Sequence, residues 1–175
     1  MKIAIVYTTV GGATRECAQL LAKQLERHDV TVADMDNALD IAPFDVVVVG
    51  FPVRMGKASK RARKYFKDNA KALRNATVGY FMCCGFVDCF DEYKEKVIPR
   101  ELSERAFDIS CFGGSLEPSR VHGLDKIVVK AVRSEILGGG ENGEDRSDMS
   151  LPTIMDENIA QFADVIKKNG ENICW

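Results

Sequence analysis

The chain has 175 residues, enough for one domain with a substantial core. Its formal net charge of −2 argues against nucleic acid as the main partner, and no run of about 18 apolar residues predicts a membrane-spanning helix. Six cysteines without an evident secretory leader lead us to expect a reducing, cytoplasmic location.

Short apolar segments alternate with helix-like segments along the whole chain. The third apolar segment contains Val46-Val47-Val48-Val49, which has no polar alternation and is typical of a central parallel strand covered on both faces. The expected strands cover 3–7, 30–33, 45–50, 77–83 and 106–112, and the expected helices cover 14–27, 57–73, 91–97, 124–137 and 156–168. Five strands with helical crossovers predict a five-stranded parallel sheet between two helix layers, a three-layer α/β/α sandwich.

The turn after the first strand is suited to binding a phosphate. It reads Thr8-Thr9-Val10-Gly11-Gly12-Ala13-Thr14 and leads into a helix. A helix N-terminus presents unpaired backbone N–H groups and the positive end of the helix dipole, and glycine lets the backbone approach a ligand closely. The threonine hydroxyls add donors, and no acidic residue precedes Glu16. The alternative is an ordinary strand-to-helix turn with Thr14 as N-cap.

Spacing excludes three other phosphate loops. The turn lacks the lysine of G-x-x-x-x-G-K-[ST], and Gly11-Gly12-Ala13 does not fit the dinucleotide pattern G-x-G-x-x-G. A cysteine phosphatase needs an arginine six residues after its cysteine. That arginine is missing after each of Cys17, Cys83, Cys84 and Cys111.

The remaining T-T-x-x-G-x-T turn resembles the phosphate loop of the flavodoxin family, whose ligand is flavin mononucleotide (FMN). Thr14-Arg15-Glu16 resembles the helix start of one branch, the flavodoxin-like protoporphyrinogen dehydrogenases, and G-x-x-x-R-x-G at Gly50, Arg54 and Gly56 is similar to that branch's second flavin loop. The resemblance implies a flavodoxin-like fold with strand order 2-1-3-4-5 and FMN bound at the switch between strands one and three. The phosphate would then be held by Thr8, Thr9, Val10, Gly11, Gly12, Ala13 and Thr14.

Two further loops are expected to frame the flavin ring, because they follow the strands beside the switch point. They supply Pro52, Val53, Arg54, Met55 and Gly56 after the third strand, and Cys84, Gly85 and Phe86 after the fourth. Arg54 would place positive charge near the flavin pyrimidine and Phe86 is the candidate for stacking, whereas a surface arginine and a core phenylalanine are the alternatives. No side chain is assigned as catalytic, because the flavin carries the chemistry.

Cys83, Cys84 and Cys89 form the spacing C-C-x-x-x-x-C, which fits no zinc or iron–sulfur signature, so no metal is expected. Neighbouring residues in a strand point to opposite faces, so Cys83 and Cys84 should separate. Buried thiols without a redox role are the simpler interpretation. Cys111 and Cys174 are interpreted as structural or incidental.

Residues 54–67 carry seven basic residues and no acidic one. A solvated helix face is the simplest interpretation, but this basic face would also suit a quinone or an acidic redox partner protein, or anionic lipid heads in a peripheral membrane contact.

We interpret residues 1–175 as a single flavodoxin-like domain with an extra helix and an acidic loop at about 115–155. The dehydrogenase branch also carries a long insertion in its C-terminal half.

Two functions follow from the resemblance. The first is an FMN-dependent oxidoreductase similar to protoporphyrinogen dehydrogenase, which passes electrons from an organic substrate to a quinone. The alternative is a non-enzymatic electron carrier between partner proteins. A third interpretation, a domain that has lost flavin, stays open because neither ring loop contains tryptophan or tyrosine.

Overall fold

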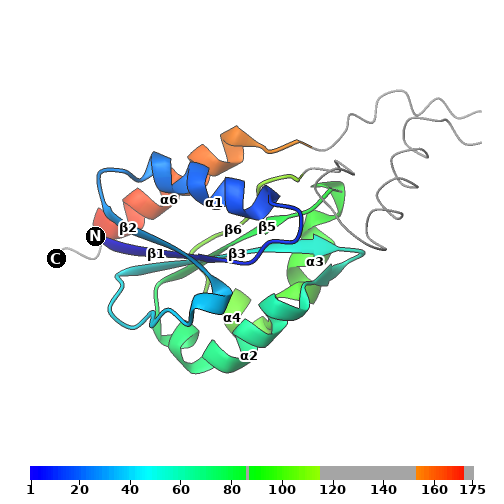
Figure 1. The fold of residues 1–175 in the computed structure, drawn as a ribbon, viewed down its shortest axis with the longest axis horizontal. Helices are drawn as coiled ribbons and strands as arrows, with labels where there is room; N and C mark the ends of the chain where they lie inside the picture. Colours follow the sequence, from blue (N-terminus) through cyan, green and yellow to red (C-terminus); the bar gives the residue numbers. More distant parts are fainter. Residues whose placement is uncertain (86, 115–152, 172–175) are drawn as a thin grey trace, which may run out of the picture.

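The computed structural model describes residues 1–85, 87–114 and 153–171 (Figure 1). A six-stranded sheet forms its centre, with β2, β1, β3, β5 and β6 side by side and parallel, and β4 pairing only with the end of β3. The strands are β1 (Lys2–Tyr7), β2 (Asp29–Asp34), β3 (Val46–Arg54), β4 (Lys57–Ala58), β5 (Val78–Cys83) and β6 (Ile109–Cys111). Because β4 lies off the main path, the expected order 2-1-3-4-5 is confirmed.

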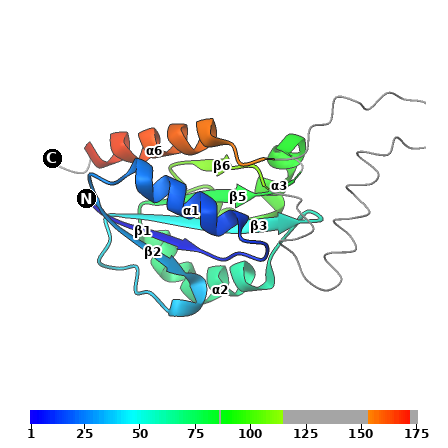
Figure 2. The same ribbon diagram turned by 45° about the horizontal axis from the view of Figure 1, so that its top comes forward.

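Helices cover both faces of the sheet, α1 and α6 on one side and α2, α3 and α4 on the other (Figures 1 and 2). Their bounds are α1 (Ala13–Gln24), α2 (Lys60–Asn75), α3 (Phe90–Val97), α4 (Arg100–Ser103) and α6 (Asp156–Glu171), with 3-10 turns η1 (Met35–Asn37) and η2 (Val87–Cys89). The three-layer α/β/α sandwich is therefore confirmed.

No helix in the described ranges is long and apolar enough to cross a bilayer. The expected helix 124–137 lies outside those ranges.

The four valines of β3 show why this segment carries no polar residue. All four are fully buried. Val46 and Val48 join the apolar cluster beneath α1 and α6, while Val47 and Val49 join the cluster beneath α2 and α4. A strand covered on both faces needs an apolar side chain at every position, which is what the sequence pattern indicated.

Two helices begin at other residues than expected. The helix expected at 57–73 begins at Lys60, because Lys57 and Ala58 pair with β3. Ser59 caps it, and its Oγ accepts a hydrogen bond from the Ala62 N–H at 3.2 Å. The first helix begins at Ala13 with Gly12 as N-cap, so Thr14 is not the cap.

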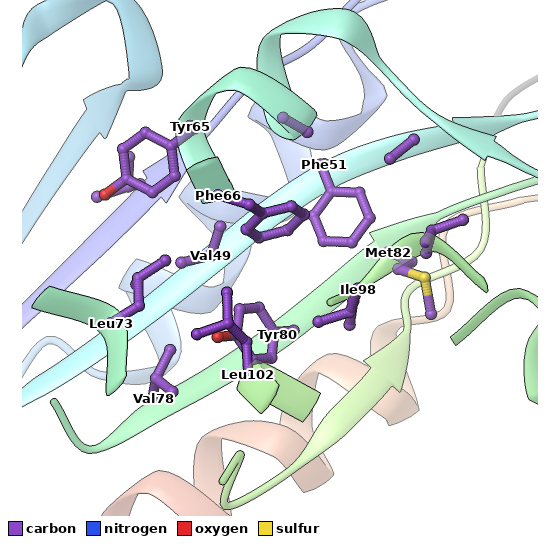
Figure 3. Close-up of a cluster of buried hydrophobic side chains, with 14 of the residues drawn as sticks. Val49, Phe51, Tyr65, Phe66, Leu73, Val78, Tyr80, Met82, Ile98 and Leu102 are labelled. Atoms are coloured by element: carbon purple, nitrogen blue, oxygen red, sulfur yellow. The ribbon is translucent and has the colours of Figure 1, made fainter. Parts of the chain in front are cut away.

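The core beneath α2 contains aromatic rings from both the helix and the sheet (Figure 3). The ring of Phe66 meets Phe51 and Tyr80 edge-on, with centroids 5.3 and 5.9 Å away. Tyr80 is fully buried, and neither its hydroxyl nor that of Tyr65 has a hydrogen-bond partner among the described residues. Burial raises the pKa of Tyr65 to about 12, and burial with the nearby Tyr65 raises that of Tyr80. Both phenols therefore stay neutral at physiological pH.

Replacing Tyr80 with phenylalanine should raise the free energy of unfolding by about 1 kcal/mol, because it removes a buried hydroxyl without a partner and keeps the ring. Urea denaturation measures the change. The control is Tyr7→Phe, which removes a hydroxyl that does accept a hydrogen bond, from Arg15 Nε at 3.1 Å, and should give no gain. A clear loss of stability in Tyr80→Phe would show that its hydroxyl is satisfied, for example by a buried water.

Candidate functional site

The segments that follow β1, β3 and β5 leave the sheet side by side. These three strands are adjacent and parallel, and Tyr7, Gly50 and Phe81 stand in one row across them. The Thr8 N–H donates to the Gly50 carbonyl at 3.0 Å, which holds the first turn against the central strand. β2 and β3, the next two strands in the chain, lie on opposite sides of β1, so this carboxyl edge is the switch point at which open α/β sheets bind ligands.

The turn between β1 and α1 is built around Gly12. Its φ is 90°, in the left-handed region, and its N–H donates to the Thr9 hydroxyl at 2.9 Å. The first bond of the helix runs from the Glu16 N–H to the Gly12 carbonyl. A Cβ added at Gly12 would meet no atom within 4 Å. Glycine is therefore favoured here by the backbone conformation, and the space beside it is open.

The start of α1 has the donors that an anion needs. The N–H groups of Ala13, Thr14 and Arg15 have no acceptor inside the helix, and the helix dipole favours negative charge there. The buried Thr8 hydroxyl has no hydrogen-bond partner among the described residues. The Thr14 hydroxyl, by contrast, is hydrogen-bonded to the thiol of Cys83, so Thr14 offers its backbone N–H. These groups fit a phosphate.

The segment after β3 is a β-hairpin rather than the expected loop. Val53 pairs with Ala58 and Arg54 with Lys57, in antiparallel register. The two residues of the turn both have positive φ, 49° at Met55 and 68° at Gly56, as in a type I′ turn. Met55 lies at the tip and is 86% exposed.

Pro52 and Val53 therefore belong to a strand, and both are buried. Figure 2 shows β3 running past the end of β1. Beyond Gly50 the strand has a parallel neighbour only on the β5 side, so the missing N–H of Pro52 breaks no ladder there. Of the residues expected to frame the ring after β3, Arg54, Met55 and Gly56 are the ones at or beside the tip.

The segment after β5 places its side chains differently from the expected ring loop. The side chain of Cys84 is buried in the cluster beneath α2, whereas Cys83 lies in the cluster beneath α1, where its Sγ is 3.6 Å from that of Cys17. The expected separation of the two cysteines is confirmed. Gly85 follows as a half-buried residue, and Phe86 lies outside the described residues. Cys84 can reach a ligand at this edge through its backbone only.

One aromatic residue near the site was missed by sequence reasoning. Tyr93 on α3 packs against the hairpin, so that a Cβ added at Gly56 would be 3.4 Å from its ring. Its hydroxyl hydrogen-bonds with the Cys89 thiol, and partial burial raises its pKa. No sequence signal pointed to Tyr93, because the contact joins a helix to a hairpin 37 positions away in the chain.

The acidic segment expected at about 115–155 begins and ends beside this edge. Gly113 bridges to Ile154, the Gly114 N–H donates to the Thr153 carbonyl at 3.2 Å, and the Met155 N–H donates to the Phe112 carbonyl at 3.0 Å. Residues 115–152 lie outside the described residues. Residues 153–155, which precede α6, thus lie beside the end of β6.

The basic face at 54–67 is partly compensated by acids outside the run. Arg61 pairs with Asp36 at 3.1 Å and Lys64 pairs with Asp68. Two of the seven basic residues are therefore paired with acids, although the run itself contains none. Four further cations of the run are exposed on the hairpin or on α2, namely Lys57, Lys60, Arg63 and Lys67.

Comparisons with known proteins identify a matching protein family and solved structures with a similar fold. The family model described as "Flavodoxin domain" matches residues 4–142. No curated protein matches the chain. Oxidised flavodoxin 2 from Bacillus cereus shares 16% identity, with 97% of this chain and 99% of that one covered and a TM-score of 0.51. The FMN-bound flavodoxin of Fusobacterium nucleatum shares 14% identity, with 96% and 98% covered and a TM-score of 0.50. A flavo-diiron protein mutant from Thermotoga maritima shares 12%, covering 96% of this chain and 35% of that one, with a TM-score of 0.56. At such identities the structural likeness concerns the fold.

Proposed function

Because the chain belongs to the flavodoxin domain family, we propose that it is a redox protein that binds FMN at the carboxyl edge of its sheet. The observation that carries this proposal is the turn at residues 8–14, with its left-handed Gly12, the open space beside it and the N–H groups at the start of α1 that have no acceptor within the helix. The structure of the Fusobacterium nucleatum flavodoxin contains FMN, which supports the choice of ligand.

In this proposal the residues from Thr8 to Thr14 bind the phosphate, largely through backbone N–H groups. The hairpin tip, with Arg54, Met55 and Gly56, and the backbone of Cys84 and Gly85 frame the ring, and Phe86 stays the candidate for stacking on it. Arg54 is half-buried, so solvent screens its charge less than that of the exposed Lys57, and it favours negative charge on the ring. FMN, when bound, supplies the electron chemistry, and these residues bind and orient it.

We propose further that the protein is an oxidoreductase that passes electrons from an organic substrate to a quinone, similar to protoporphyrinogen dehydrogenase. The exposed Met55 gives the hairpin tip an apolar surface for such a substrate, and the hairpin has no tryptophan or tyrosine to cover a ring. The Thr14-Arg15-Glu16 helix start and the Arg54 hairpin carry the resemblance to that branch. Residues 1–175 would form one domain, with 115–152 inserted between β6 and α6. A cytoplasmic location remains a prediction.

The second candidate is an electron carrier that docks on partner proteins. The exposed cations Lys57, Lys60, Arg63 and Lys67 favour it, because a basic surface steers an acidic redox partner toward the edge where FMN would lie. The same cations would attract anionic lipid heads near a membrane. Arg61 and Lys64, which pair with acids, add less to this field.

Stepwise anaerobic reduction of the FMN-loaded protein, followed by addition of a water-soluble quinone, tests the proposal. An oxidoreductase should take up two electrons in one step and then reduce the quinone repeatedly. A carrier should take up one electron at a time and reduce the quinone slowly and without steady turnover. A protein that does not bind FMN at micromolar concentration would contradict both functions.

A further inference from the structure

Two buried thiols stand close together where β5 and β6 end. The Sγ atoms of Cys84 and Cys111 are 3.4 Å apart, and the two residues are only 4% and 3% exposed. Met82 is the register partner of Cys111, so Cys84 lies two residues beyond that partner, on the same face of the sheet. The backbones that follow β5 and β6 also lie close together, since a Cβ added at Gly114 would be only 3.0 Å from the Cys84 carbonyl oxygen. The fold itself therefore holds the two sulfurs together.

The surroundings of this pair favour a thiolate on Cys111. A hydrogen bond from the Cys84 thiol lowers the pKa of Cys111 to about 7, with further hydrogen bonds involving the backbone of Gly113 and Cys84, although burial acts in the opposite direction. The thiolate is the nucleophilic form of cysteine, so Cys111 is activated at neutral pH.

The second pair of thiols provides an internal comparison. Cys17 and Cys83 lie on the other face of the sheet with their Sγ atoms 3.6 Å apart. There the pKa of Cys83 is raised, because its thiol donates to Cys17 and both burial and the neighbouring sulfur disfavour the thiolate. The two pairs have similar separations, but the pKa is lowered at Cys111 and raised at Cys83. Within the described ranges no three His, Cys, Asp or Glu side chains form a metal-binding group, so the Cys84 and Cys111 sulfurs act as a pair.

We propose that Cys84 and Cys111 are a peroxide-oxidised dithiol that closes to a reversible disulfide. The Cys111 thiolate attacks one oxygen of hydrogen peroxide, the O–O bond breaks, and Cys111 becomes a sulfenic acid while hydroxide leaves. The Cys84 sulfur then attacks the Cys111 sulfur, the S–O bond breaks, and water leaves with the proton of the Cys84 thiol. Two thiols and one hydrogen peroxide thus give one disulfide and two waters, a two-electron oxidation.

The geometry fits this reaction and this oxidant. A disulfide has an S–S length of about 2.05 Å, so the two sulfurs need to approach by only about 1.3 Å. Their burial excludes bulky disulfides and favours a small oxidant such as hydrogen peroxide. Dithiothreitol would reverse the step by thiol–disulfide exchange after local opening. The proposal goes beyond the proposed function, because it concerns thiols that are present whether or not FMN is bound.

Peptide mapping of the full chain without FMN tests the proposal. The protein is treated with equimolar hydrogen peroxide, its remaining thiols are alkylated under denaturing conditions, and the digest is analysed by mass spectrometry. The expected result is a cross-linked peptide pair containing Cys84 and Cys111, which dithiothreitol converts back to two alkylated peptides. Cys111→Ser should lose the cross-link and consume peroxide at least tenfold more slowly, whereas the matched variant Cys17→Ser should behave as the parent protein.

Three results would overturn the proposal. One is full alkylation of Cys84 and Cys111 after peroxide treatment. Another is a cross-link between a different pair, such as Cys17 and Cys83, and the third is oxidation of Cys111 that dithiothreitol does not reverse. The map of the unaltered protein decides the question even if Cys111→Ser fails to fold, and circular dichroism checks that variant.

Discussion

Replacing Gly12 with aspartate should weaken FMN binding about 100-fold. The new carboxylate would stand at the N-cap of α1, beside the N–H groups proposed to hold the FMN phosphate. Repulsion between a carboxylate and a doubly charged phosphate at about 5 Å amounts to about 3 kcal/mol in a half-exposed site. That free energy corresponds to a loss of about two orders of magnitude in affinity. Quenching of FMN fluorescence on titration with protein measures it.

The matched control is Gly12→Asn, which has nearly the same shape as the aspartate variant but no charge. Asparagine and aspartate adopt positive φ more readily than other side chains and should meet the same strain at the φ of 90°, so the two variants should fold equally well. Binding by Gly12→Asn should stay within about tenfold of the parent protein, since only electrostatic repulsion is missing. Equal affinities of the two variants would show that the phosphate is not held at the start of α1.

Replacing Gly50 with alanine should destabilise the fold by about 3 kcal/mol or more. A Cβ at this position would lie 2.0 Å from Cζ of Phe81, far inside any contact distance. Phe81 cannot turn aside, because its ring stacks on Phe112 with centroids 4.5 Å apart, and Phe112 in turn meets Phe162 edge-on. The backbone of Gly50 is held between β1 and β5. Urea denaturation measures the loss in free energy of unfolding.

A double-mutant cycle with Phe81→Leu separates the steric clash from other effects of the substitution. Leucine removes the ring atoms that the new Cβ would meet, so Gly50→Ala should cost only about 1 kcal/mol in that background. If the loss is the same with phenylalanine and with leucine at position 81, the clash is not its cause. Gly50 also matters for the proposed function, because its carbonyl accepts the hydrogen bond that anchors Thr8 at the start of the turn proposed to bind the phosphate.

The parallel sheet and its two helix layers could be predicted from local patterns, whereas the strand order was implied by the resemblance to flavodoxins. The run Val46-Val47-Val48-Val49 indicated a central parallel strand because a strand buried on both faces tolerates no polar residue, and the structure buries all four valines. The turn between β1 and α1 could be predicted in the same way, because its glycines and threonines separate an apolar strand from the helix that follows. These features depend on residues that are close together in the chain.

The hairpin could not be predicted from the same kind of pattern. Pro52 normally argues against a strand, and Met55-Gly56 lacks the asparagine or aspartate that marks a type I′ turn. An extended Pro52 is acceptable because β1 ends at Tyr7, the partner of Gly50, and so does not pair with β3 at Pro52. That information lies in the pairing of strands, not in the segment itself.

The pairing of Cys84 with Cys111 was also beyond sequence reasoning. The two residues are 27 positions apart and come together only because β5 and β6 are neighbours in this register. The alternation of a strand predicted that Cys83 and Cys84 face opposite sides, but it could not say which thiol each would meet.

Comparing FMN with riboflavin as ligands of the purified protein shows whether the turn at residues 8–14 binds a phosphate. The two share the same ring and differ only in the terminal phosphate, so the comparison isolates the turn at residues 8–14. We expect FMN to bind with a ratio of one per chain and at least about 100-fold more tightly than riboflavin, because its phosphate accepts charge-assisted hydrogen bonds from a helix N-terminus. Equal affinity for the two, or no binding of either at micromolar concentration, would contradict it.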